Sequence, residues 1–318
     1  MIEPGWSLEV DPESDGDRLD RFIARRLSRV SRNRAARLEV VDLDAPTSSA
    51  LLKKSARVRC GQRLWVKRPP PDEDLSALSP PTLISECDRF IVIDKPFGWA
   101  VHPTASRFHT TITTWMKREG LKGTPTHRLD VETSGVLLCA KRRADEAMIK
   151  AAFRAHRVKK YYRAICEGAP PVEVGQSWVD HTALGFDLES AVRIKMGRGA
   201  LEARTHFTLL ALDQSASTPL RSLILAEPQS GRQHQIRAHL SMSGLPIVGD
   251  KLYGHSESYF LAHLEGTLSS TQLEDLGHHR HALHADRVSI LLEDIHYQWS
   301  APWPQDLNMV YPLCEREY

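Results

Sequence analysis

The chain has 318 residues, 41% of them hydrophobic and 26% charged, a composition that is typical of globular proteins and excludes wholesale disorder or a fibrous repeat. This length allows about two domains. No apolar run approaches the roughly 20 residues of a membrane-spanning helix, and the acidic segment up to Asp20 lacks the pattern of a secretory signal. We therefore expect a soluble, cytoplasmic protein without a membrane partner.

Charge is distributed unevenly along the chain. The formal net charge is +2, yet residues 17–68 contain 15 Lys or Arg against 5 Asp or Glu, a local charge of +10. The five cysteines stand singly without a CxxC pair, which predicts neither a disulfide framework nor a zinc ribbon. The basic block is typical of a surface that binds polyanions.

Two helices and two strands are predicted in this basic block. Apolar residues at three- and four-residue steps predict a helix over 19–30, and a second short helix follows over 32–39. Alternating residues predict strands over 56–59 and 63–66. The helices carry arginines that we take as candidate contacts to a polyanion: Arg21, Arg25, Arg32 and Arg34. The block is thus predicted to be a small α/β domain over 15–68.

A proline-rich segment separates this block from the rest of the chain. Residues 68–81 hold five prolines in fourteen positions, a density that excludes helix interiors and central strands. We therefore expect a linker over 69–82 and a second domain over 83–318. Periodicity in that domain predicts helices over 144–156 and 233–242 and strands over 90–94, 135–140, 162–167, 205–212 and 222–227. Strands and helices that intermix so irregularly favour an α+β fold.

The densest group of polar residues lies at 127–135, immediately before a predicted strand. Asp130 in this segment is a candidate nucleophile or base, because an ionised carboxylate can attack an electrophilic carbon. An Asx-turn or a capping interaction with Thr133 and Ser134 is an equally open interpretation. A two-carboxylate glycosidase, with Asp130 and Glu132 as nucleophile and acid, is a further alternative.

A second group, GRQHQIR at 231–237, begins a predicted helix. Glycine before a helix can cradle an anion, and an arginine near a carboxylate lowers the pKa of that carboxylate. Arg237 could therefore bind phosphate or pair with Asp130, and a surface helix with ordinary arginines stays open as well.

Two further groups of residues are candidate sites. Lys160-Tyr161-Tyr162 places two aromatic rings beside a cation, where they could stack on bases or fill the core. Four histidines, His278, His279, His281 and His284, have spacing that could suit zinc. Because the sequence shows no carboxylate or cysteine nearby as a third ligand, we expect solvated histidines and no metal.

Several ordered motifs resemble those of the RluA family of pseudouridine synthases. HRLDVETSG at 127–135 resembles the family signature HRLDxxTSG. The other matching motifs are KPFG at 95–98 with HP at 102–103, KYY at 160–162, GRQHQIR at 231–237, PIVGD at 246–250 with YG at 253–254, and LHA at 283–285. The basic block is similar to the small RNA-binding domain named after ribosomal protein S-four.

The resemblance implies a pseudouridine synthase catalytic fold with a mixed, largely antiparallel sheet and flanking helices, preceded by the RNA-binding domain. It also implies that uridine in RNA is isomerised to pseudouridine without redox chemistry or energy input. No cofactor is therefore expected, in agreement with the lack of GxGxxG and Walker-type loops in the sequence. Asp130 would be the nucleophile, and it would attack either the anomeric carbon or the uracil ring.

The resemblance also assigns roles to other residues. Arg237 would pair with Asp130 and keep it anionic, and Arg128 would fill the space that the base leaves. Tyr162 would pack against the flipped base and could help to remove the proton from C5. Lys95 and Arg232 are expected to contact backbone phosphates. The predicted substrate is 23S ribosomal RNA, with transfer RNA as the alternative within the family. A catalytically silent RNA-binding assembly factor stays open too, and nothing in the sequence demands more than a monomer.

Overall fold

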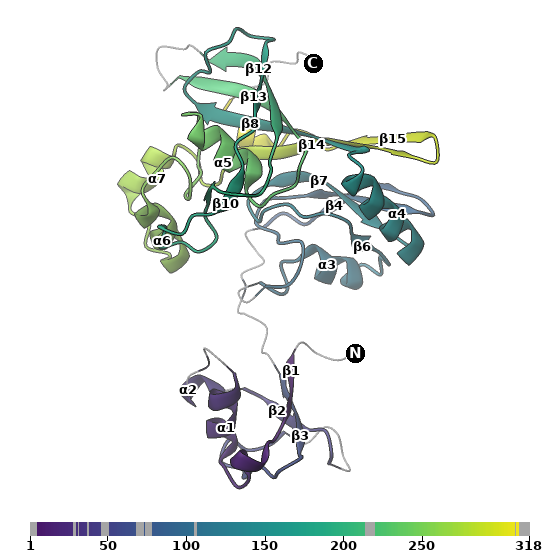
Figure 1. Cartoon of the computed structure of the whole chain (residues 1–318), viewed down its shortest axis with the longest axis vertical. Coiled ribbons are helices and arrows are strands. Elements are labelled where there is room, and N and C mark those ends of the chain that lie inside the picture. Colours follow the sequence, from purple (N-terminus) through teal and green to yellow (C-terminus); the bar gives the residue numbers. More distant parts are fainter. Residues whose placement is uncertain are drawn as a thin grey trace. The chain divides into compact units, whose positions relative to one another are not determined.

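The computed structural model describes residues 5–27, 30, 32–36, 38–45, 51–67, 73, 78–104, 107–213, 220–308 and 310–311, with the side chains of residues 33 and 34 left aside. The chain divides into two compact units, Met1–Asp72 and Glu73–Tyr318 (Figure 1). Most of the expected linker over 69–82 lies outside the described residues. No helix in the described ranges is long and apolar enough to cross a membrane.

The first unit contains a three-stranded antiparallel sheet in the order β1-β3-β2. Its elements are β1 (Gly5–Glu9), η1 (Pro12–Ser14), α1 (Leu19–Arg26), α2 (Arg32–Ala35), β2 (Val40–Asp42) and β3 (Arg63–Lys67). β1 pairs with β3, so the unit begins before the expected residue 15. The predicted strand over 56–59 is wrong, because there only Arg57 forms an isolated bridge, to Arg18.

The apolar face of α1 forms the core of this unit. Leu19, Phe22 and Ile23 are fully buried, and they pack with Leu64 and Val66 of β3. The opposite face of the helix carries the arginines, as helical periodicity requires.

A 10-stranded mixed sheet forms the centre of the second unit, with eight strands in the order β4-β5-β7-β14-β8-β13-β12-β9. β6 pairs with β7 and β15 pairs with β14. The strands are β4 (Thr82–Glu86), β5 (Phe90–Lys95), β6 (Thr124–Pro125), β7 (Ser134–Ala140), β8 (Val158–Glu167), β9 (Ser177–Asp180), β12 (Thr205–Asp213), β13 (Arg221–Pro228), β14 (Leu283–Leu292) and β15 (Ile295–Ser300). A separate pair joins β10 (Leu184–Phe186) to β11 (Met196–Arg198).

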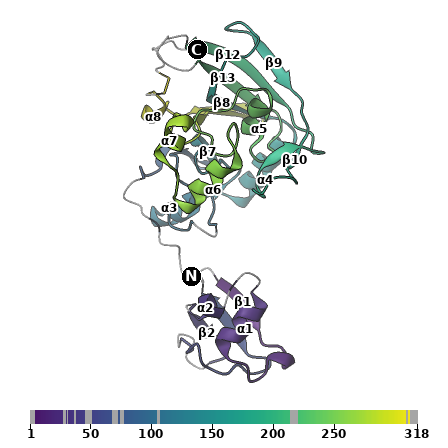
Figure 2. The same cartoon turned by 90° about the vertical axis from the view of Figure 1, so that its left-hand side faces the viewer.

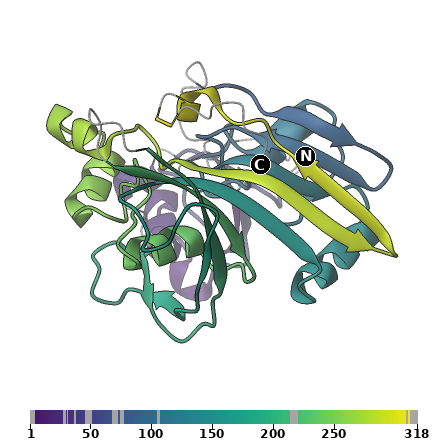
Figure 3. The same ribbon diagram turned by 90° about the horizontal axis from the view of Figure 1, so that it is seen from above.

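Helices flank this sheet on both sides. They are α3 (Ile112–Arg118), α4 (Arg143–Arg154), α5 (Gln235–Met242), α6 (Glu257–Glu265), α7 (Ser270–Leu276) and α8 (Gln305–Asn308). α4 and α5 lie on one side of the sheet and α8 lies on the other (Figures 2 and 3). The expected mixed, largely antiparallel sheet with flanking helices is therefore present.

The one parallel pairing among the described strands joins β7 to β14, with His284 opposite Ser134 and Ala285 opposite Gly135. Gly135 has φ +112°, and a Cβ atom there would lie 2.1 Å from the Ala285 carbonyl oxygen. Only glycine permits so close an approach of two backbones. β7 begins directly after the polar segment that contains Asp130, so this contact also fixes the end of that segment.

Glu73, the first residue of the second unit, is held by a loop before α3. Its carboxylate accepts hydrogen bonds from the backbone N–H groups of Phe108, His109 (2.9 Å) and Thr110 (2.7 Å), and from the Thr110 hydroxyl. Burial alone would raise the pKa of Glu73, but these hydrogen bonds hold it below its ordinary value. Ser79 in the following segment is also held, since the Trp99 indole donates to its carbonyl oxygen at 2.9 Å.

Candidate active site

Asp130 lies in the polar segment before β7, next to Arg237 of α5. Nη1 of Arg237 donates to Oδ2 of Asp130 at 3.0 Å, and 32% of the Asp130 side chain is exposed. The two residues that the sequence placed in separate motifs thus meet in one ion pair.

Arg237 is shared between two carboxylates. Its Nε and Nη2 donate to the two oxygens of Asp250 at 2.7 and 2.8 Å, and only Nη1 is directed at Asp130. Asp250 is fully buried and also accepts the backbone N–H groups of Leu252 and Tyr253. Because a bidentate pair fixes the plane of the guanidinium, Asp250 orients the third donor toward Asp130.

The charge state of Asp130 depends on Arg237. Burial by itself would raise the pKa of Asp130, but the positive charges around it lower the pKa below its ordinary value. His234 contributes little positive charge at neutral pH, because burial lowers its own pKa to about 4. The guanidinium is always protonated, so it keeps Asp130 ionised at neutral pH.

Tyr162 of β8 lies close to Asp130 and is 8% exposed. Burial raises the pKa of its phenol, and the negative charge of Asp130 raises it further. The phenol is therefore neutral at any physiological pH. A neutral aromatic ring beside an ionised carboxylate offers a surface on which a planar base can stack.

Comparison with known proteins agrees with this geometry. The family model for RNA pseudouridylate synthase matches residues 89–242. The chain is 30% identical to an uncharacterized RNA pseudouridine synthase of Chloroflexus aurantiacus over 95% of this chain and 91% of that protein. This chain belongs to the RluA family of RNA pseudouridine synthases.

Two other comparisons extend over most of the synthase. It is 29% identical to the ribosomal large subunit pseudouridine synthase D of Zymomonas mobilis, over 98% of each chain. Its fold is similar to that of human RNA pseudouridylate synthase domain containing 1, with a TM-score of 0.57 over 72% of this chain and 86% of the human one, at 22% identity. The synthase is therefore an isomerase that acts on RNA.

Buried side chains support the segment that carries Asp130. Nε2 of His281 lies 2.8 Å from the Thr133 hydroxyl, and Nδ1 of His284 lies 2.9 Å from the Ser134 hydroxyl. Burial lowers the pKa of both histidines, that of His284 to about 3, so both are neutral. The expectation of solvated histidines is wrong for these two, because the parallel β7–β14 pairing brings them under the Asp130 segment.

Lys95 is not placed to contact phosphate, and that prediction is wrong. Its side chain is fully buried, and Nζ donates to the carbonyl oxygens of Pro96 (3.1 Å), Trp99 (2.9 Å) and Val131 (3.2 Å). Burial lowers its pKa to about 7. An ammonium has three donors, and all three are used here. Lys95 thereby links Val131, the residue after Asp130, to the KPFG segment.

The remaining predicted RNA contacts are exposed to different degrees. Arg128 is exposed, and in the described part of the chain it forms no hydrogen bond or ion pair. Arg232 is exposed too, although its Nε donates to the Glu202 carbonyl at 2.9 Å. Both therefore keep guanidinium donors available for a ligand.

Of the arginines predicted in the first unit, Arg21 is exposed. Arg25 pairs with Asp17 at 3.0 Å and Arg32 pairs with Asp20 at 3.3 Å. The side chain of Arg34 lies outside the described residues. Some of the arginines that the sequence predicted to bind a polyanion are therefore paired with aspartates of the same unit.

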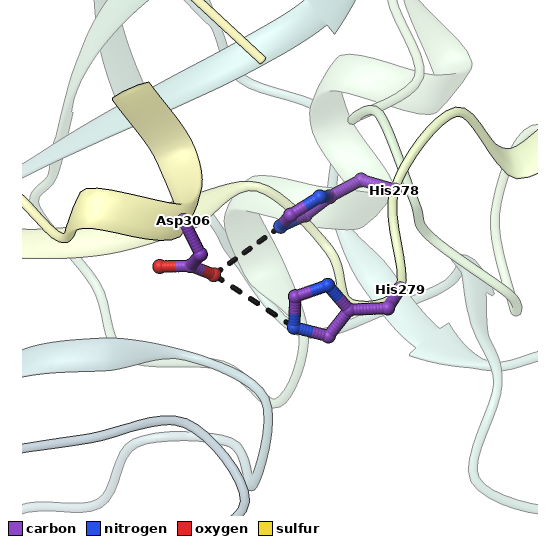
Figure 4. Close-up of side chains that lie close together, drawn as sticks. All are labelled: His278, His279 and Asp306. Carbon is purple, nitrogen blue, oxygen red and sulfur yellow. Dashed lines mark hydrogen bonds and ion pairs between the residues drawn. The ribbon is translucent and has the colours of Figure 1, made fainter. Parts of the chain in front are cut away.

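One group of three among the described residues has the composition of a metal site: His278, His279 and Asp306 (Figure 4). Asp306 supplies the carboxylate that the sequence did not reveal, with Oδ2 3.2 Å from Nε2 of His278 and 3.8 Å from Nε2 of His279. Both of its oxygens also accept from Arg280, at 2.6 and 3.1 Å. A guanidinium thus neutralises the carboxylate that a cation would need.

The sequence did not assign roles to Asp250, Tyr253 and His234, which surround Arg237. The Arg237 guanidinium lies 5.1 Å from the centre of the Tyr253 ring, and the Tyr253 hydroxyl lies 3.1 Å from Nδ1 of His234. The signal was present in the PIVGD and YG motifs. Asp250 belongs to the first motif and Tyr253 to the second, and a buried aspartate requires a cationic partner such as Arg237.

Proposed function

We propose that Asp130 is the nucleophile with which this synthase isomerises uridine. The observation that carries the proposal is the ion pair with Arg237, which keeps a carboxylate anionic at 32% exposure. In the reaction the bond from the ribose C1′ to N1 of uracil breaks and a bond from C1′ to C5 forms. The C5 proton is released and N1 is protonated, so atoms balance. Whether Asp130 attacks C1′ or the uracil ring, its carboxylate must be ionised.

Tyr162 stacks on the target base in this proposal. Its raised pKa keeps the phenol protonated, so the ring acts as a packing surface and not as a phenolate base. Arg128 is exposed two residues before Asp130. Its planar guanidinium fills the space that the extruded base leaves and recovers part of the lost stacking, which costs a few kcal/mol.

The proposed substrate is large-subunit (23S) ribosomal RNA. The relative from Zymomonas mobilis, whose name specifies the ribosomal large subunit, aligns over 98% of both chains. The basic first unit, which we take as an S-four-like RNA-binding domain, provides phosphate contacts beyond the site. We further propose that the synthase acts as a cytoplasmic monomer, since ribosomal RNA is the substrate in this proposal and Asp130, Arg237 and Asp250 satisfy one another within a single chain.

A site-resolved pseudouridine map of total RNA tests reaction and substrate together. The map compares cells with and without the protein, and the deletion is rescued by wild type or by Asp130→Asn. We expect sites in 23S ribosomal RNA to be lost and restored only by wild type, because the amide cannot act as the nucleophile.

Other outcomes of the map are equally informative. Sites lost only from transfer RNA would keep the chemistry and overturn the proposed substrate. Restoration by Asp130→Asn would overturn the assignment of the nucleophile, and a map without any lost site would favour the RNA-binding assembly factor.

A further inference from the structure

Lys160 is a partly buried cation that the ion pairs of the site leave unused. It lies in β8, two residues before Tyr162, and is half-buried. Its Nζ donates to the Ser230 carbonyl at 3.2 Å and lies 5.9 Å from the centre of the Phe153 ring. No carboxylate of the described residues lies within ion-pair distance of Nζ.

The surroundings of Lys160 make this arrangement costly in the free protein. Burial alone lowers its pKa to about 8, and no negative charge opposes the shift. One carbonyl uses one of the three ammonium donors, and no other described residue accepts a hydrogen bond from the remaining two. Placing a charge in such surroundings is unfavourable unless an anion compensates it. A bound anion would compensate the positive charge of Lys160.

The position of Lys160 indicates which anion that is. Successive odd or even residues of a strand point to the same face, so Lys160 and Tyr162 share a face at a separation of roughly 7 Å. Ser230, its hydrogen-bond partner, belongs to the segment that leads into α5 and Arg237. Burial lowers the pKa of His127, which precedes Arg128, and the charge of Lys160 lowers it further, to about 3. The ammonium therefore lies beside both segments that form the site.

We propose that Lys160 binds a backbone phosphate of the RNA strand next to the target nucleotide. The inference rests on the proposed function, since it assumes that the base stacks on Tyr162. The phosphate replaces the missing carboxylate and accepts hydrogen bonds from the two unused donors, so the contact contributes to RNA affinity. In this proposal Lys160 makes the phosphate contact that the sequence predicted for Lys95.

The test compares Lys160→Met with a matched control on the same strand, Lys159→Met. Lys159 is exposed and points to the opposite face of β8, so it shares charge and strand but not the site. The probe is a synthetic RNA stem-loop around the mapped uridine. We expect Lys160→Met to raise Kd and KM about tenfold with kcat within about twofold, and to reduce the slope of log K against log salt by about 0.7–0.9. Lys160→Arg should restore most of the affinity, and Lys159→Met should stay within about twofold of wild type.

A neutral-phosphate scan gives the decisive comparison. Methylphosphonate linkages are introduced one at a time around the target uridine. At one linkage, the methylphosphonate should weaken RNA binding by wild type but leave RNA binding by Lys160→Met unchanged. Equal losses for both proteins at every linkage, or an unchanged salt slope, would overturn the phosphate contact.

The scan also separates this proposal from the proposed function. An effect of Lys160→Met on kcat alone would assign the residue to chemistry or folding, and would overturn the contact. If Lys160→Met does not fold, the scan is repeated with Lys160→Gln. An empty pseudouridine map would overturn the proposed function, whereas binding of oligouridylate by wild type and Lys160→Met, compared across salt concentrations, would still decide the Lys160 contact.

Discussion

Arg237 shows how one side chain controls the chemistry of its neighbours. Its guanidinium lies between Asp130 and Asp250, and together the three groups carry one net negative charge. Asp250 accepts from Nε and Nη2 in a bidentate pair and leaves Nη1 to donate to Asp130. A lysine would supply the charge but not the rigid fork, so charge and geometry can be tested separately.

Replacing Arg237 by Gln removes the charge that lowers the pKa of Asp130. The pKa of Asp130 should then rise, so protonation would inactivate the nucleophile at a higher pH than in wild type. We expect the acid limb of kcat/KM against pH to move to higher pH and the plateau to fall about 10- to 100-fold. The measurement is single-turnover kinetics across the pH range in which both proteins remain folded.

Arg237→Lys is the control for this prediction, because it keeps a positive charge near Asp130. Its plateau should fall while its acid limb stays closer to that of wild type. An acid limb that does not move in Arg237→Gln would contradict the view that Arg237 sets the ionisation of Asp130.

At the scale of elements, the contact between β7 and β14 is the point where the polar segment meets the sheet. The two strands are parallel, and they are about 150 positions apart in the sequence. Gly135 permits the approach, and the histidines of β14 and of the turn before it support Thr133 and Ser134 from below.

Replacing Gly135 by Ala should therefore destabilise the synthase by about 3 kcal/mol or more, because it combines a strained φ with a collision against the Ala285 carbonyl. Gly120→Ala is the matched control. Its φ is also positive, at +72°, but a Cβ atom there meets nothing within 4 Å. The free energy of unfolding measured in urea should fall by about 1 kcal/mol in the control. Equal losses in the two variants would show that the close approach contributes nothing.

The sequence predicted the elements whose pattern is local. Continuous apolar runs marked β5 and β7, and three- and four-residue steps marked α4 and α5. Short edge strands such as β1 and β9 were missed, because four or five residues carry too little periodicity.

In the site, too, sequence patterns predicted local features but not contacts that form only on packing. The residues alone left the partner of Arg237 open, the family resemblance implied Asp130, and the structure places Nη1 of Arg237 3.0 Å from Oδ2 of Asp130. The burial of Lys95 could not be predicted, since the three carbonyl groups around it come together only after β5 and the Asp130 segment are packed.

At the scale of the whole molecule, charge is divided between the two units. The first contains the block with a local charge of +10, in a chain whose net charge is only +2. The second holds the Asp130–Arg237–Asp250 group, in which one cation lies between two carboxylates. Long-range attraction of RNA is therefore expected to depend on the first unit and local alignment on the second.

Deleting residues 1–72 should weaken RNA binding and reduce its dependence on salt, because fewer phosphates are neutralised. The salt slope should fall by several units, while single-turnover kcat at saturating RNA stays within a few-fold. Binding of the same RNA by the full chain and the shortened chain across salt concentrations checks this. An unchanged salt slope would show that the phosphate contacts lie elsewhere.

The hydrogen bonds to Glu73 have a consequence for exchanging modules between proteins. A carboxylate at the start of the second unit is fastened by three successive backbone amides, so the catalytic module extends upstream of its first strand, β4. A different RNA-binding module should therefore be joined before Glu73. A fusion made at Thr82, where the sheet begins, would remove Glu73 and the Ser79 contact with Trp99. The loop before α3, which also donates from Arg107 to the Gly98 carbonyl, would then be less firmly held in the fusion protein.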